Sequence, residues 1–226
     1  TDDGRADYKS GKGFRARARH KSGGRSEFRG RGRGRSGASR QQDRYRPLGR
    51  PEVLKVLQSQ DMLPAITFIF SRAGCDGALY QCLRSRMVLT SQEEAQQIKE
   101  IVDAGVEGIP EEDLQVLDFK RWREALSRGF AAHHAGMLPA FRHIVEDLFV
   151  RGLVRAVFAT ETLALGINMP ARTVVLEKLI KFNGEAHVDL TPGQYTQLTG
   201  RAGRRGIDTL GLSLIHISEP TRRTPI

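Results

Sequence analysis

Short apolar runs alternate along the chain with amphipathic segments of helical spacing. Three runs predict β-strands, at residues 66–70, 154–159 and 173–176. Apolar residues at successive positions are typical of a strand buried on both faces, as in a parallel sheet. The clearest helical spacing runs from Pro139 to Gly152. Because strands alternate with helices, we predict an α/β fold with a parallel sheet flanked by helices.

Helix start signals add detail to this pattern. Residues 53–57 have the spacing of an amphipathic helix, and residues 77–86 also look helical. Residues 90–94 offer a capping box in either of two registers, which opens a helix to about Asp103. Thr191 as N-cap, followed by a proline at the first helical position, predicts a final helix.

A further helical segment precedes the Pro139 helix. Pro110 is followed by three acidic residues, which the helix dipole favours in a first turn. Apolar residues then recur at roughly helical spacing up to Phe130, and Gly129 marks the end of the helix. We expect Trp122 among the apolar residues to serve packing. We interpret residues 87–130 as a helical insert that covers the sheet.

The positive charge of the chain lies in its first 50 residues. Of the net charge of +10, residues 1–50 supply 13 Arg and 3 Lys against 5 acidic residues, a net of +11. This Arg/Gly-rich basic segment has little apolar surface to bury, so we expect it to be disordered. One interpretation is nonspecific pairing of guanidinium groups with nucleic-acid phosphates, and the other is a solvated linker.

Several classes of protein are excluded by composition. Cys75 and Cys82 lack zinc-ligand spacing and are too few for a zinc site, so we expect buried thiols. No apolar run is long enough to span a bilayer, and no secretory signal opens the chain. We therefore expect a cytoplasmic protein without a membrane partner. The first residue, Thr1, indicates a fragment of a longer protein.

The strongest candidate for chemistry is the segment 197–206. Arg201 and Arg204 are three residues apart, and small residues such as Gly200 allow another surface to come close. A guanidinium group is always charged and forks onto phosphate oxygens, as a phosphoryl-transfer site requires. A basic surface turn is the alternative. The catalytic interpretation expects both arginines at the carboxyl edge of the sheet.

A second candidate is the loop at residues 159–170, which follows a predicted strand. Ligand loops of open α/β sheets lie at this end of their strands. Thr160 and Thr162 would offer hydroxyl groups to a phosphate backbone, and Asn168 would bond a ribose. An ordinary connection between strand and helix is the alternative.

Paired histidines form a third candidate. No further ligand stands at standard metal spacing from His133 and His134, so we expect no metal site. Adjacent side chains on a strand also point apart. One imidazole is expected to be a structural hydrogen-bonding group or to touch nucleic acid.

These stretches, in this order, resemble the second RecA-like domain of DExH-box helicases of superfamily two. The similarity is greatest to the superkiller-type RNA helicases, in particular their actinobacterial members, and covers residues 51–211. Four stretches carry the resemblance: residues 68–72 (motif IV), 133–139, 158–172 (motif V) and 197–206 (motif VI).

The resemblance implies roles for individual residues. Two arginines would be catalytic as arginine fingers that reach ATP: Arg201 and Arg204. Four residues would lie near the nucleotide: Gln197, Gly200, Gly166 and Asn168. Five residues would contact RNA: Ser71, Arg72, His134, Thr160 and Thr162.

The implied mechanism is closure of two RecA-like domains around ATP and Mg²⁺, which grips RNA. The chain has neither a G-x-x-x-x-G-K-[ST] loop nor a DExH tetrad. The triphosphate cradle and the Mg²⁺ carboxylate are therefore expected on the N-terminal RecA-like domain of the same protein, and the chain alone is expected to be inactive. RNA-degradation machinery is a further expected partner.

Two other functions stay open, a non-catalytic RNA-binding module and a DNA helicase of the same superfamily. Phosphate contacts by Thr and Arg do not distinguish RNA from DNA. Residues 212–226 do not resemble the continuation of the family, and we interpret them as an atypical tail similar to translated sequencing-adapter read-through.

Overall fold

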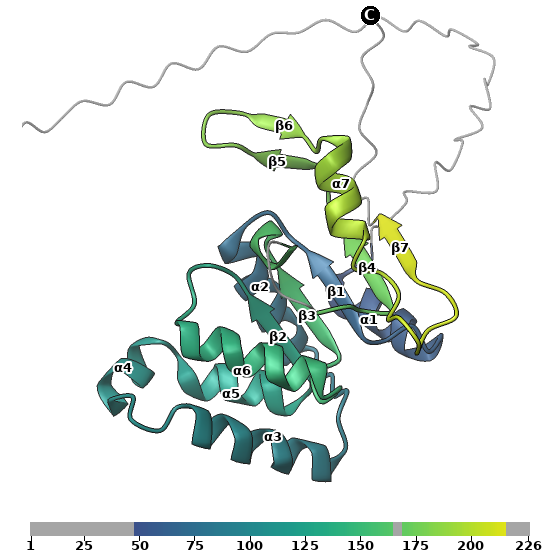
Figure 1. Cartoon of the computed structure of the whole chain (residues 1–226). Helices are drawn as coiled ribbons and strands as arrows, with labels where there is room; N and C mark the ends of the chain where they lie inside the picture. The colour runs from purple at the N-terminus through teal and green to yellow at the C-terminus, as the bar shows by residue number, and fades with distance from the viewer. Residues whose placement is uncertain (1–47, 165–168, 216–226) are drawn as a thin grey trace, which may run out of the picture. The chain divides into compact units, whose positions relative to one another are not determined.

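The computed structural model describes residues 48–164 and 169–215. The predictions for residues 1–47 and 216–226, and those for Gly166 and Asn168, lie outside the described residues. Figure 1 shows a sheet of parallel strands flanked by helices, which confirms the predicted fold class. The strands lie side by side in the order β2 (Phe130–His133), β3 (Ala156–Ala159), β1 (Ala65–Phe68), β4 (Thr173–Leu176) and β7 (Leu212–Ile215).

One face of the sheet is covered by α1 (Arg50–Ser59) and α2 (Arg72–Arg84). Successive residues of β1 alternate between the two faces, as the strand period requires. Ala65 packs in the cluster with α1 and α2, whereas Ile66 and Phe68 pack in the cluster on the other face. The central strand is therefore buried on both sides, as its apolar run predicted.

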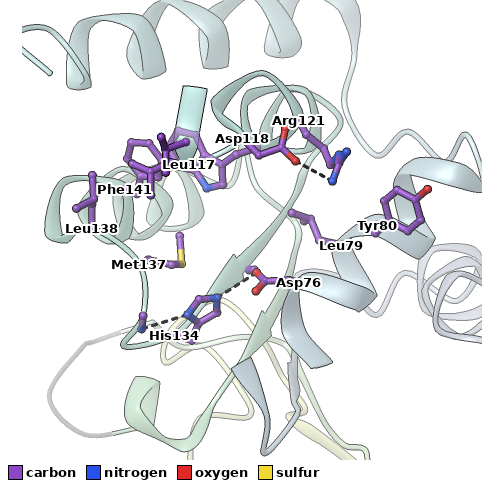
Figure 2. A pocket seen from close by; sticks show the side chains of 14 residues that line it. Asp76, Leu79, Tyr80, Leu117, Asp118, Arg121, His134, Met137, Leu138 and Phe141 are labelled. Carbon is purple, nitrogen blue, oxygen red and sulfur yellow. Dashed lines mark hydrogen bonds and ion pairs between the residues drawn. The ribbon is translucent and has the colours of Figure 1, made fainter. Parts of the chain in front are cut away.

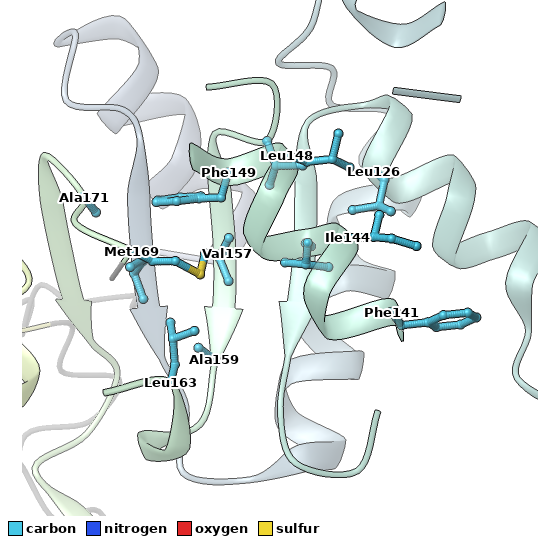
Figure 3. Close-up of a cluster of buried hydrophobic side chains, with 14 of the residues drawn as sticks. Leu126, Phe141, Ile144, Leu148, Phe149, Val157, Ala159, Leu163, Met169 and Ala171 are labelled. Atoms are coloured by element: carbon cyan, nitrogen blue, oxygen red, sulfur yellow. The ribbon is translucent and has the colours of Figure 1, made fainter. Parts of the chain in front are cut away.

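The other face is covered by α3 (Gln92–Gly105), α5 (Phe119–Ser127) and α6 (Pro139–Val150). Figure 3 shows Phe149 of α6 in one buried cluster with Val157 of β3 and Met169. The predicted helices at residues 53–57, 77–86 and 90–103 and after Pro139 are confirmed. Of the two capping registers for α3, the structure has the Ser91–Glu94 pair.

The single helix predicted between Pro110 and Gly129 is interrupted. It is divided into α4 (Glu111–Val116) and α5 by Asp118, whose φ of 53° lies outside the helical region. Gly129, with φ of 88°, then ends the helical segment, and the buried Phe130 begins β2. The run Phe-Ala-Ala-His has no β-branched residue, so its sequence gave little strand signal.

Three further strands were not predicted. Strands β5 (Ile180–Phe182) and β6 (His187–Asp189) form an antiparallel hairpin between β4 and α7 (Pro192–Thr199). The first residues of the segment interpreted as an atypical tail form β7, which pairs with β4. No helix in the described part of the chain is long and apolar enough to cross a bilayer.

Candidate nucleotide and RNA interface

The loops after three neighbouring strands meet at the carboxyl edge of the sheet (Figure 1). Ser71 and Arg72 follow β1, His134 follows β2, and Thr160 follows β3. The strands are parallel and in register, since Phe68 and His133 are both paired with Ala159. The fold therefore gathers the residues predicted to contact RNA at one edge, where open α/β sheets bind ligands.

Local hydrogen bonds fix these loops. The Ser71 hydroxyl caps α2 by accepting a bond from the Gly74 amide at 3.2 Å. The Thr160 amide donates to the His133 carbonyl at 3.2 Å. The hydroxyls of Thr160 and Thr162 lie 2.9 Å apart and share a hydrogen bond. These hydroxyls are therefore held at the edge, where they would be available to a phosphate.

The two adjacent histidines bond to opposite helical layers. His133 Nε2 lies 2.8 Å from Glu146 on α6, whereas His134 Nε2 lies 3.1 Å from Asp76 on α2. Within the described residues, no three metal-ligating side chains come together. Burial lowers the pKa of His133, so its ring is favoured in the neutral form.

The tautomer of His134 follows from its neighbours. The Gly136 amide donates to its Nδ1 at 3.2 Å, so in the neutral ring Nε2 carries the proton and donates to Asp76 (Figure 2). The imidazole is buried, and beside it lies a hollow of about 320 Å³. The structure therefore favours the structural role for this ring, with Arg72 above it as the exposed group.

A groove of about 650 Å³ extends the carboxyl edge toward the β5–β6 hairpin. It runs from Ser71 at the start of α2 to Phe182, whose ring is exposed and lies 5.5 Å from that of His187. Lys178 adds positive charge to its wall, whereas Lys181 is ion-paired with Glu161. Glu177 and Arg50, which also line the groove, are paired with each other. The sequence analysis did not identify these groups, because the charges after residue 50 nearly balance. The basic and aromatic residues at 178–187 were the signal that could have indicated a binding groove.

The segment 197–206 crosses from one edge of the sheet to the other. Helix α7 begins near the carboxyl edge, where the Leu190 amide bonds to the Leu179 carbonyl at 2.8 Å. Beyond α7 the chain lies beside Ala171, which precedes β4. The Ala171 amide donates to the Arg201 carbonyl at 2.9 Å, and the Gly203 amide donates to the Ala171 carbonyl at 2.7 Å.

Arg204 consequently lies at the amino edge of the sheet. It lines a hollow of about 320 Å³ with Pro64 and Arg155, which precede β1 and β3. The expectation that it faces the carboxyl edge is wrong. Residues after α7 must lead into β7, and consecutive parallel strands start at the same edge. Because the sequence pattern did not predict β7, it gave no reason to place Arg204 at the amino edge.

Main-chain contacts of glycine hold this loop in place. Gly203 has a φ of 90°, which side-chain-bearing residues rarely adopt. A Cβ on Gly211 would lie 2.6 Å from backbone atoms of Ala202, so the main chain at Gly211 is in direct contact with the main chain at Ala202. Gly200, at the end of α7, is exposed.

Of the residues predicted to lie near the nucleotide, the structure describes Gln197 in α7 and Gly200 at the end of that helix. Gln197 is exposed on the helix and lines a hollow of about 200 Å³ with Glu161 and Lys181, which are ion-paired at 2.6 Å. Arg201 and Arg204 lie at the other end of the helix. The structure therefore does not bring Gln197 and Arg204 into one pocket within this chain.

Comparison with known proteins gives the context of these features. Residues 111–206 match the model of the helicase conserved C-terminal domain. The chain is 67% identical over 171 residues to probable helicase HelY of Mycobacterium tuberculosis, covering 76% of the chain and 19% of that protein. It is 38% identical over 168 residues to the DExH-box ATP-dependent RNA helicase DExH10 of Arabidopsis thaliana, covering 74% of the chain and 17% of that protein. The chain is 40% identical over 163 residues to human superkiller complex protein 2, covering 72% of the chain and 13% of that protein. The chain thus spans a fifth or less of the length of these relatives.

Proposed function

We propose that the chain is the second half of an ATP-dependent RNA helicase motor, because residues 111–206 match the helicase conserved C-terminal domain and the chain is similar to HelY and to human superkiller complex protein 2. The observation that carries this proposal is the match of residues 111–206 to the helicase conserved C-terminal domain, which includes Arg201 and Arg204 in a segment whose main chain is fixed against Ala171. A phosphoryl-transfer site uses such fixed cations to stabilise charge on the γ-phosphate.

In this proposal, Arg201 and Arg204 act as arginine fingers on a nucleotide held by another domain. No phosphate-binding loop and no DExH tetrad occur in the sequence. The N-terminal RecA-like domain would supply the triphosphate cradle and the carboxylate for Mg²⁺, and this chain alone would not hydrolyse ATP. Since Arg204 lies at the amino edge of the sheet, the nucleotide domain would approach that side.

RNA is proposed to lie across the opposite, carboxyl edge. The hydroxyls of Ser71, Thr160 and Thr162 and the exposed guanidinium of Arg72 would hold its phosphates. The groove beside Phe182 offers an aromatic ring and lysines, the combination that binds single strands. RNA is favoured over DNA because the Arabidopsis relative is named as an RNA helicase. The name of the human relative, superkiller complex protein 2, favours a multiprotein complex as partner.

The variant Arg201→Ala, made in a protein with both motor domains, tests the proposal. RNA-stimulated ATP turnover should fall by about 10³-fold or more, while RNA affinity stays within about twofold. Arg205→Ala is the matched control, because this exposed arginine belongs to the same segment. Undiminished ATP turnover in Arg201→Ala would remove the assignment.

A non-catalytic RNA-binding module is the second candidate, favoured by the basic and aromatic groove at the carboxyl edge. A binding module tolerates the loss of Arg201 and Arg204 apart from a small charge effect. A DNA helicase would instead show stronger stimulation of ATP turnover by single-stranded DNA than by single-stranded RNA.

A further inference from the structure

We propose that Asp208 is a positioning residue that fixes the orientation of the Arg204 guanidinium toward the nucleotide. The inference rests on the proposed role of Arg204 as an arginine finger. It concerns a residue beyond the segment 197–206, and it assigns to that residue a role in ATP turnover.

Asp208 holds Arg204 at three points. The Arg204 Nε donates to Asp208 Oδ2 at 2.9 Å, and its Nη2 donates to Oδ1 at 2.8 Å. The main-chain amide of Arg204 also donates to Oδ2, at 2.9 Å. A carboxylate that binds both the side chain and the main chain of one arginine restricts the torsion angles between them.

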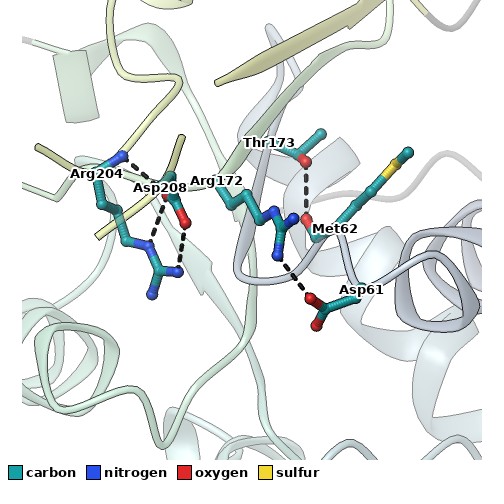
Figure 4. Close-up of polar contacts among 6 residues, drawn as sticks. All are labelled: Asp61, Met62, Arg172, Thr173, Arg204 and Asp208. Carbon is teal, nitrogen blue, oxygen red and sulfur yellow. Dashed lines mark hydrogen bonds and ion pairs between the residues drawn. The ribbon is translucent and has the colours of Figure 1, made fainter. Parts of the chain in front are cut away.

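This arrangement decides which edge of the guanidinium is open. Asp208 occupies the edge formed by Nε and Nη2. Among the described residues, none bonds to Nη1, and Figure 4 shows this nitrogen of Arg204 directed away from Asp208. A phosphate can therefore be bound only through the outer edge, formed by Nη1 and Nη2. A finger already held in this orientation loses less conformational entropy when the nucleotide arrives.

Burial and charge keep the pair intact. The Asp208 side chain is 4% exposed, whereas that of Arg204 is 26% exposed, so the arginine is the member that faces solvent. The hydrogen bond from the Arg204 side chain, with a smaller contribution from the charge of Arg172, lowers the pKa of Asp208 to about 2. Asp208 therefore stays ionised at neutral pH, and Arg204 keeps its partner.

The main chain of the loop has anchors that do not involve the Asp208 carboxylate. The Gly203 amide bonds to the Ala171 carbonyl, and the Asp208 amide bonds to the Arg204 carbonyl at 3.0 Å. Loss of the carboxylate should release the guanidinium while the loop stays in place. The variant that lacks the carboxylate therefore tests the positioning of Arg204 without removing these main-chain anchors of the loop.

The test is Asp208→Asn in a protein with both motor domains. The amide keeps the shape of the carboxylate but places an N–H group against the donors of Arg204. We expect kcat for RNA-stimulated ATP hydrolysis to fall by about 10- to 100-fold, with the KM for ATP changed less than about threefold. Asp103→Asn is the matched control, since the Asp103 carboxylate of α3 binds Nε and Nη2 of Arg123 in α5 in the same way, with Nε at 2.7 Å, and does not line the hollow beside Arg204; its kcat should stay within about twofold.

A double-mutant cycle with Arg204→Ala tests whether the loss of kcat in Asp208→Asn arises through Arg204. If Asp208 acts through Arg204, adding Asp208→Asn to Arg204→Ala causes no further loss of kcat. Multiplicative losses would overturn the inference, as would a normal kcat in Asp208→Asn when Arg204→Ala is inactive. Normal turnover in Arg204→Ala would instead refute the finger role on which the inference rests. If Asp208→Asn does not fold, Asp208→Glu is tested in its place. A lowered kcat with an unchanged KM for ATP would support the positioning role of Asp208, and an unchanged kcat would overturn it.

Discussion

A single methyl group at Gly136 should weaken RNA binding at the carboxyl edge. A Cβ at this position would lie 3.2 Å from Nδ1 of His134 and 3.3 Å from Cδ of Arg72. Both distances are shorter than ordinary van der Waals contact, so both neighbours must shift by a few tenths of an ångström, and the more mobile one shifts further. His134 is buried and bonded to Asp76, whereas Arg72 is exposed, so we expect the arginine to be displaced.

The magnitude follows from one lost phosphate contact. A contact worth about 1 kcal/mol corresponds to an increase of about fivefold in the Kd for single-stranded RNA. For a single strand, the slope of log K against log salt should also become shallower by about 0.7, the value for one phosphate. Arg72→Ala should give the same change in slope, because both variants remove the same contact.

The assay is fluorescence anisotropy of a labelled single-stranded RNA, titrated with the 226-residue chain at several salt concentrations. Gly77→Ala is the matched control: it lies in the same α2 helix as Arg72, and its Cβ would meet no atom within 4 Å. An unchanged Kd and salt slope in Gly136→Ala would refute the placement of RNA at this edge. Equal weakening in Gly77→Ala would refute the steric argument.

Two further predictions concern stability. Leu148→Ala removes a fully buried side chain of α6 and should lower the free energy of unfolding in urea by about 2–5 kcal/mol; a loss below about 1 kcal/mol would contradict the packing shown in Figure 3. Burial lowers the pKa of His133, so its contribution to stability is present in full above about pH 6.5 and is lost as the pH falls toward the folded-state pKa, by at most about 1.4 kcal/mol per pH unit. Urea unfolding at pH 7.5, 6.5 and 5.5 measures this slope, and His133→Gln should lack it.

The sequence by itself determined the elements whose signals are local. The apolar runs at residues 66–70, 154–159 and 173–176 contain β3, β4 and nearly all of β1, because a strand buried on both faces must be apolar at successive positions. Thr191 was identified as a helix cap because its hydroxyl bonds to an amide only three residues away. The segment 197–206 was identified as a candidate site from its two arginines and from its resemblance to motif VI of the helicases.

Only the tertiary structure decided which distant residues meet. Strands β2 and β7 are stabilised by pairing with β3 and β4, which no periodicity within their own four residues reveals. The edge at which Arg204 lies depends on where the chain must enter β7, and so does its partnership with Asp208. Hydrogen bonds and packing between segments far apart in the chain fix these positions, so the proposed nucleotide and RNA sides of the domain became distinguishable only in three dimensions.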